Sequence, residues 1–88
     1  MVDMIKALAD ENRFKIVELL SRGSLCVCEI EESLKLPQNL VSHHLSVLKE
    51  SGLVEDCRCG KKNYYSLNRA VINKMVKVIT RIGVKNED

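Results

Sequence analysis

The sequence has no long hydrophobic run, no internal repeat and no low-complexity segment. No apolar stretch approaches the ~20 residues of a membrane span, and no signal-peptide pattern opens the chain. A glycine-rich phosphate loop is also absent. The two histidines are neighbours in the sequence, so that Ser42 beside His43 lacks an independent base and an orienting acid. We therefore expect a cytoplasmic protein that is not an enzyme and has no contact with a membrane.

Composition and charge indicate a small globular protein with one basic half. Hydrophobic residues make up 45% of the chain and charged residues 30%. A single domain of this size, residues 1–88, buries only a modest core, so that pairing with a second copy is expected. Residues 1–56 contain six Lys/Arg against ten Asp/Glu, whereas residues 57–88 contain eight against two. A basic half of this kind is typical of nucleic-acid binders, although basic helices are also commonly just solvated.

Residues 36–54 predict a helix with one buried face and one polar face. Pro37 suits the first turn, because its missing N–H would have no intrahelical partner there, and Gly52 stands where the helix should end. An apolar stripe with i, i+4, i+7 spacing is expected to be buried: Val41, Leu45 and Leu48. The opposite face is polar and nearly uncharged: Gln38, Asn39, Ser42, His43 and Ser46. Such side chains can read base edges, and an ordinary polar helix face is the alternative.

The segment before this helix favours DNA binding. Val27, Ile30 and Leu34 mark a short helix, and Leu36 with Pro37 makes a tight connection to the polar-faced helix. This is a helix-turn-helix arrangement, whose second helix enters the major groove of DNA.

Two further helices are expected before the helix-turn-helix, and a β-hairpin after it. The first helix begins almost at Met1, and the second spans about residues 11–22 with Asp10 as its N-cap. Four side chains of the second helix are expected in the core: Phe14, Ile16, Val17 and Leu20. Residues 53–59 and 64–67 predict two strands joined by a basic turn at residues 60–63.

The last helix, expected at about residues 69–84, has a broad apolar face. Two adjacent rows form it, one of Val71, Met75, Val78 and Ile82, and one of Ile72, Val76 and Ile79. Such a face can pack on its own domain and still cover a partner, so we expect a homodimer through the first and last helices. A core helix in a monomer is the alternative.

Four stretches together resemble the ArsR/SmtB family of winged-helix repressors: residues 8–14, 25–30, 41–54 and 60–67. The resemblance implies a mainly α-helical winged helix-turn-helix that dimerises through its first and last helices. It also implies repression on double-stranded palindromic operator DNA, with no cofactor needed for binding, and release when a metal or metalloid binds. By matching position, Gln38, Asn39, Ser42 and His43 would contact bases, and the wing residues Arg58, Lys61 and Lys62 would contact phosphates or the minor groove. His44 is expected to pack or hydrogen-bond inside the domain.

Four cysteines in a short cytosolic chain favour thiolate ligation over a disulfide framework. Cys26 and Cys28 lie where the first helix of the helix-turn-helix begins. This helix positions the polar-faced helix of residues 36–54, which we call the reading helix, so that an ion bound at the two cysteines would pull on it. Thiolates select soft ions such as Cu(I), Zn(II), Cd(II) or trivalent arsenic. The Leu-Cys-Val-Cys-Glu sequence resembles the branch of the family that senses As(III), Cd(II) or Pb(II). Arsenic sensors of this branch typically have a third cysteine at the position of Glu31.

Cys57 and Cys59 are candidates to complete the site. Alternation along a strand places both on one face, where they could approach the first pair after some movement, form a separate site, or be incidental wing residues. The last helix has no His, Asp or Glu before Glu87, which excludes the zinc site that other family members carry there. Two alternatives stay open: a thiol redox switch, and a constitutive winged helix with structural zinc.

Overall fold

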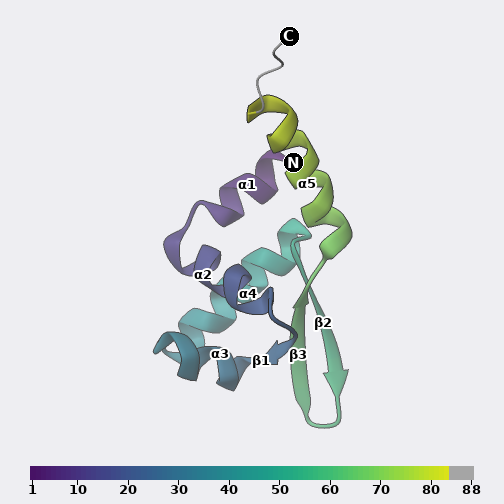
Figure 1. The fold of residues 1–88 in the computed structure, drawn as a ribbon. Coiled ribbons are helices and arrows are strands. Elements are labelled where there is room, and N and C mark those ends of the chain that lie inside the picture. The colour runs from purple at the N-terminus through teal and green to yellow at the C-terminus, as the bar shows by residue number, and fades with distance from the viewer. Residues whose placement is uncertain (84–88) are drawn as a thin grey trace.

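The computed structural model describes residues 1–83, which form five helices and three strands (Figure 1). The helices are α1 (Val2–Leu8), α2 (Glu11–Leu20), α3 (Val27–Leu34), α4 (Gln38–Ser51) and α5 (Arg69–Gly83). The strands are β1 (Leu25–Cys26), β2 (Val54–Cys59) and β3 (Lys62–Leu67). The order confirms the expected mainly α-helical fold, in which a β-hairpin wing lies between the helix-turn-helix and the last helix.

Local capping defines the first helix of the helix-turn-helix. Cys26 is the N-cap of α3, and its N–H donates to Glu29 Oε1 at 3.0 Å. The helix ends at Lys35, which adopts a left-handed conformation with φ 55°. Because this cap holds Cys26 in place, the start of α3 and the end of β1 are positioned together.

The second helix of the helix-turn-helix, predicted over residues 36–54, spans Gln38–Ser51. Pro37 is the N-cap of α4, with extended geometry at φ −66° and ψ 151°, and is not in the first turn. Its carbonyl oxygen accepts from the N–H groups of Leu40 and Val41, each at 3.1 Å. The proline therefore starts the helix without removing one of its hydrogen bonds. Gly52 ends α4 at φ 92°, as expected, since a glycine has no Cβ to strain there.

The hydrophobic core lies where α4 packs against α2 and α3. Seven large side chains are fully buried: Ile16, Leu20, Ile30, Val41, Leu45, Leu48 and Leu53. The expected apolar stripe of α4 is confirmed. The expectation for Phe14 was wrong, because this side chain is 49% exposed. Residues two apart differ by about 200° around a helix, so the stripe through Ile16 and Leu20 turns Phe14 outward.

The wing is part of a three-stranded antiparallel sheet with the order β1-β3-β2. Cys26 of β1 pairs with Tyr64 of β3, and Cys57 of β2 pairs with the same tyrosine from the other side. β3 begins at Lys62, two residues earlier than expected, because the hairpin turn is confined to Gly60 and Lys61. The hairpin projects away from the helices (Figure 1).

α5 runs away from the sheet toward the end of the molecule where the N-terminus lies (Figure 1). Met75 is buried, but Val76, Ile79 and Ile82 are 53%, 53% and 81% exposed. Met1, Val2 and Ile5 at the start of the chain are also exposed apolar side chains. The expected end of α5 at Val84 lies outside the described residues. None of the helices in residues 1–83 is both long enough and apolar enough to cross a membrane.

Candidate nucleic-acid interface and thiol site

The polar face of α4 is open to solvent along its length. All five of its expected residues are exposed: Gln38, Asn39, Ser42, His43 and Ser46. The opposite face holds the core, so these side chains are presented by a helix whose position packing determines. A rigid helix with amides, hydroxyls and an imidazole on its outer face has the groups and the geometry to enter a major groove.

His44 lies on the inner side of the same helix and is 5% exposed. Its Nδ1 accepts from Arg13 Nη1 at 3.2 Å, since an arginine can only donate. In the neutral ring Nε2 then carries the proton, and it faces Asp10 Oδ2 at 3.8 Å. The expectation that His44 is engaged inside the domain is confirmed. Burial lowers the pKa of His44, the Asp10 carboxylate opposes this shift, and the Arg13 guanidinium adds to it.

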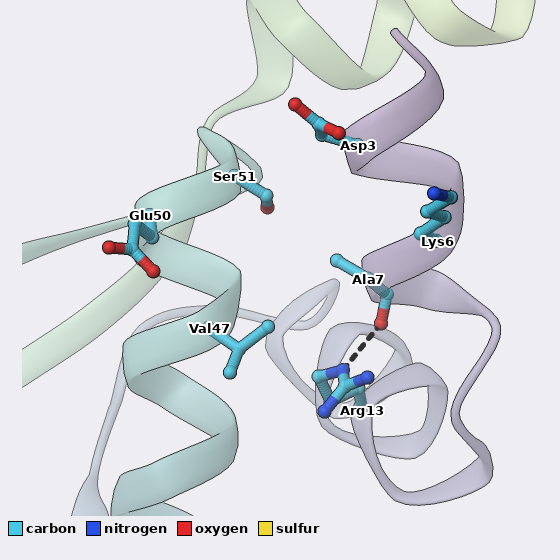
Figure 2. A pocket seen from close by; sticks show the side chains of 7 residues that line it. All are labelled: Asp3, Lys6, Ala7, Arg13, Val47, Glu50 and Ser51. Carbon is cyan, nitrogen blue, oxygen red and sulfur yellow. Dashed lines mark hydrogen bonds between the residues drawn. The ribbon is translucent and has the colours of Figure 1, made fainter.

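Arg13 connects this network to the first helix. Figure 2 shows its guanidinium turned toward α1, where Nε donates to the carbonyl oxygen of Ala7 at 2.7 Å. A pocket of about 360 Å³ lies between α1 and α4. Figure 2 shows Val47 of α4 pointing toward α1 across it. The role of Arg13 was not predicted from the sequence. Its place at the third position after the N-cap predicts a helical residue but carries no information on a partner 31 residues away.

The wing carries its cations at and beside the turn. Arg58, Lys61 and Lys62 are all exposed, and Gly60 turns the chain with φ 64°. These cations add positive charge beside the nearly uncharged face of α4, where phosphate contacts would add affinity without sequence information.

An ion pair ties the wing to the reading helix. Lys49 Nζ of α4 lies 2.9 Å from Asp56 Oδ1 of β2. Asn63 Nδ2 of β3 donates to Asp56 Oδ2, also at 2.9 Å. The bond from Asn63, followed by that from Lys49, holds the pKa of Asp56 below its usual value. The carboxylate therefore joins both strands of the wing to the last turn of α4.

The first thiol pair is compact. Cys26 is buried, Cys28 is exposed, and their Sγ atoms lie 3.1 Å apart. The hydrogen bond with Cys28 is the main reason why the pKa of Cys26 is raised. Binding of a soft ion requires thiolates, so each thiol that becomes a ligand must release its proton.

A hollow of about 420 Å³ lies beside this pair. Its lining includes Cys26, Cys28, Glu31, Gln38, Lys62 and Asn63. We call it the thiol hollow. It is bordered by α3, by the first residue of the reading helix and by the wing, so it joins the candidate sensor to both candidate DNA-binding elements.

The second thiol pair lies apart from the first. Cys57 and Cys59 are exposed on β2, and Tyr64 of β3 separates Cys57 from Cys26. Two strand spacings amount to about 10 Å, which is too far for one ion to bridge without movement. In residues 1–83 no three or more His, Cys, Asp or Glu side chains are grouped so that they could hold a metal ion. In the described residues the four thiols therefore form two separate pairs.

Comparisons with known proteins agree on the type of fold. Residues 10–56 match the family described as bacterial regulatory protein, arsR family. The arsenical resistance operon repressor of Staphylococcus aureus is 33% identical over 84 residues, which cover 96% of this chain and 81% of the relative. The repressor of the same name from Escherichia coli is 42% identical over 79 residues, covering 89% of this chain and 68% of the relative.

A solved structure extends this similarity to three dimensions. It is the homodimeric winged helix-turn-helix DNA-binding domain Mb0332 from Mycobacterium bovis, described as a possible ArsR-family transcriptional regulator. The two structures align with a TM-score of 0.76 at 29% identity, covering 99% of this chain and 83% of that domain.

Proposed function

Because the chain belongs to the ArsR family of bacterial regulatory proteins, a family of DNA-binding transcriptional regulators and not of enzymes, we propose that it represses transcription from a specific operator. A soft metal or metalloid ion bound at cysteine thiolates would relieve this repression. The observation that carries the proposal is the location of the paired thiols of Cys26 and Cys28, at the N-terminus of the helix that precedes the reading helix.

In this proposal α4 reads the bases and the wing binds the backbone. Gln38, Asn39, Ser42 and His43, with Ser46 further along the same face, contact base edges. Arg58, Lys61 and Lys62 contact phosphates or the minor groove. What supports this division is that all these side chains are exposed while the other side of α4 is buried in the core.

A homodimer would present two reading helices to a palindromic operator in double-stranded DNA. Half-sites bound in this way lie one helical turn apart, at about 34–36 Å. The exposed apolar residues of α1 and α5 support pairing through these helices. A cytoplasmic location follows for a protein that binds DNA and whose own thiols must stay reduced.

The residues at the thiol hollow fit a thiophilic ion in part. Cys26 and Cys28 supply two soft ligands, and As(III), Cd(II), Pb(II) and Zn(II) are the candidate ions. Glu31 also borders the hollow, but it would have to move toward the two thiols to add a carboxylate oxygen. Cys57 and Cys59 would become ligands of the same ion only after a movement that brings them closer to Cys26, because Tyr64 of β3 lies between.

A thiol redox switch is the second candidate function, favoured by the 3.1 Å separation of the Cys26 and Cys28 sulfur atoms. A disulfide within a C-x-C sequence closes a small, strained ring. A disulfide between the two pairs needs Cα atoms within about 7 Å, closer than two strand spacings. Ion binding requires neither distortion, and it is therefore the function that we favour.

Fluorescence anisotropy tests the proposal. An operator is first selected with the reduced protein from a pool of random duplexes, then labelled, bound, and titrated with arsenite, Cd(II) and Zn(II). We expect one ion to release the wild-type protein but not the Cys26→Ser/Cys28→Ser variant. The control variant Cys57→Ser/Cys59→Ser shows whether the wing thiols take part. Operator binding that no ion weakens would contradict release by a soft ion. Failure to select any operator would contradict sequence-specific DNA binding.

A further inference from the structure

The thiol hollow brings together residues that the proposed function assigns to two different tasks. Cys26 and Cys28 belong to the sensor, whereas Gln38 and Lys62 belong to the surface that contacts DNA. Gln38 is the first residue of α4, and Lys62 is the first residue of β3. The sensor therefore borders one residue from each DNA-binding element directly, with no intervening helix.

The register of the sheet is a second, independent reason to place Lys62 beside Cys26. Cys26 pairs with Tyr64, and Lys62 stands two residues earlier on the same face of β3. Diagonal neighbours of this kind have Cβ atoms about 7–8 Å apart, within reach of a long side chain. The Lys62 ammonium also contributes to the lowered pKa of Glu29, although the Cys26 N–H is the larger cause. Glu29 in turn caps α3 at Cys26.

We propose that Lys62 and Gln38 are the residues through which ligand binding at Cys26 and Cys28 weakens DNA binding. This coupling acts within one protomer and does not pass through the dimer interface. It rests on the function proposed above and specifies how that function is regulated.

The coupling is steric, because the bound ion and the side chains of Lys62 and Gln38 compete for the same space in the thiol hollow. In the ligand-free protein the two sulfur atoms lie together at one side of the hollow, and Lys62 and Gln38 are free to face DNA. When both thiols give their protons to solvent and turn toward a common ion, that ion and its remaining ligands take up part of the hollow. The side chains of Lys62 and Gln38 then leave the positions from which they contact a phosphate and a base.

Two matched pairs of variants test this inference. Lys62→Gln and Lys61→Gln each remove one wing cation, but only Lys62 borders the hollow. Gln38→Ala and Asn39→Ala each remove one amide from the reading face, but only Gln38 borders the hollow. Both wing variants should weaken operator binding alike and reduce the salt slope by about one phosphate contact.

The measured quantity is the ratio of the operator Kd with and without the ion, using Cd(II) and arsenite as probes. Allosteric ratios are typically about 5–150-fold, and we expect the wild type, Lys61→Gln and Asn39→Ala to share one value in that range. For Lys62→Gln and Gln38→Ala we expect the ratio to fall at least about threefold below that shared value. Ion affinity without DNA, followed by the ultraviolet absorption of Cd(II)–thiolate bonds, should be the same in all five proteins.

The outcomes separate this inference from the function on which it rests. If neither ion releases the wild type, the proposed inducer class is wrong. If at least one ion releases the wild type and all four variants keep its ratio, the role of Lys62 and Gln38 is wrong while the proposed function stands. A Lys62→Gln variant whose ion affinity without DNA falls as much as its ratio of operator Kd values would also overturn the inference. Lys62 would then act on the ion site itself.

A second measurement does not depend on substitutions. Cys28 is exposed and borders the hollow, so bound operator should slow its alkylation by N-ethylmaleimide, as read by mass spectrometry. An unchanged rate of Cys28 alkylation on the operator complex would contradict a hollow that faces DNA.

Discussion

Two neighbouring histidines on α4 have opposite surroundings. His43 is exposed on the polar face, whereas His44 is enclosed by Arg13 and Asp10. A helix turns by about 100° per residue, so a single step along the chain moves an imidazole from solvent to the core. The two side chains are expected to affect different properties, DNA recognition and stability.

Replacement of Ser42 or His43 by alanine should weaken binding to the operator more than binding to unrelated DNA. Each lost base contact is expected to cost about 1–3 kcal/mol on the operator, while phosphate contacts remain. Anisotropy titrations on the operator and on a scrambled duplex at the same salt concentration measure the difference. Equal losses on the two duplexes would remove these residues from the reading surface.

His44 should make stability depend on pH near neutrality. Its pKa is lowered in the folded protein, so below the unfolded value of about 6.5 the unfolded chain binds a proton that the folded chain does not. Stability is therefore fully present above this pH and falls as the pH is lowered through 6.5 toward the folded pKa. Urea midpoints measured from pH 7.5 to 5.5 should fall in the wild type and fall less in His44→Gln, which keeps an acceptor for Arg13. Parallel curves would contradict this assignment.

One carboxylate, that of Asp56, links the wing to the reading helix. Asp56→Asn removes a negative charge, which by charge alone would strengthen binding to DNA. We expect weaker operator binding instead, because Lys49 and the wing lose their common partner. The folded state should lose little stability, since ion pairs near the surface stabilise weakly.

Glu11→Gln is the matched control for this experiment. It breaks the exposed pair between Glu11 and Lys15 on α2, at 3.1 Å, with the same change in net charge but far from the wing. Tighter operator binding by Asp56→Asn, equal to that of the control, would show that the carboxylate acts only through its charge.

The elements differ in how far the sequence predicts them. The reading helix α4 was predicted well because local signals specify it: the stop at Gly52 and an apolar stripe that recurs every three to four residues. Asp10 marked the start of α2 in the same way. Phe14 was misplaced because apolar side chains lie on two faces of α2, and only packing against the rest of the domain decides which face is buried. Pairings between distant residues, such as Lys49 with Asp56, leave no periodic signal in the sequence.

The thiol site was predicted in composition but not in geometry. The C-x-C spacing made it plain that Cys26 and Cys28 are close together. Their separation from Cys57 depends on the strand order β1-β3-β2, which puts Tyr64 between the two pairs. No feature of one strand specifies which strand lies next to it, so this distance could only come from the fold.

The elongated chain leaves the apolar face of α5 exposed. The molecule measures 54 × 23 × 21 Å, and α5 contributes much of its length. Ile79→Glu on this face should abolish the dimer in sedimentation experiments and with it tight operator binding. Lys77→Glu, a larger change of charge on the polar side of the same helix, should leave the dimer intact. A dimer that survives Ile79→Glu would place the interface elsewhere.

The uncovered face of α5 also bears on how much protein a cell needs. If two chains must meet before either half-site is held firmly, the amount of active repressor rises with the square of the chain concentration when dimers are scarce. Thermal stability should rise with concentration for the same reason, because association favours the folded state. Modest changes in the expression of this one gene would then alter the basal output of its target promoter more than proportionally.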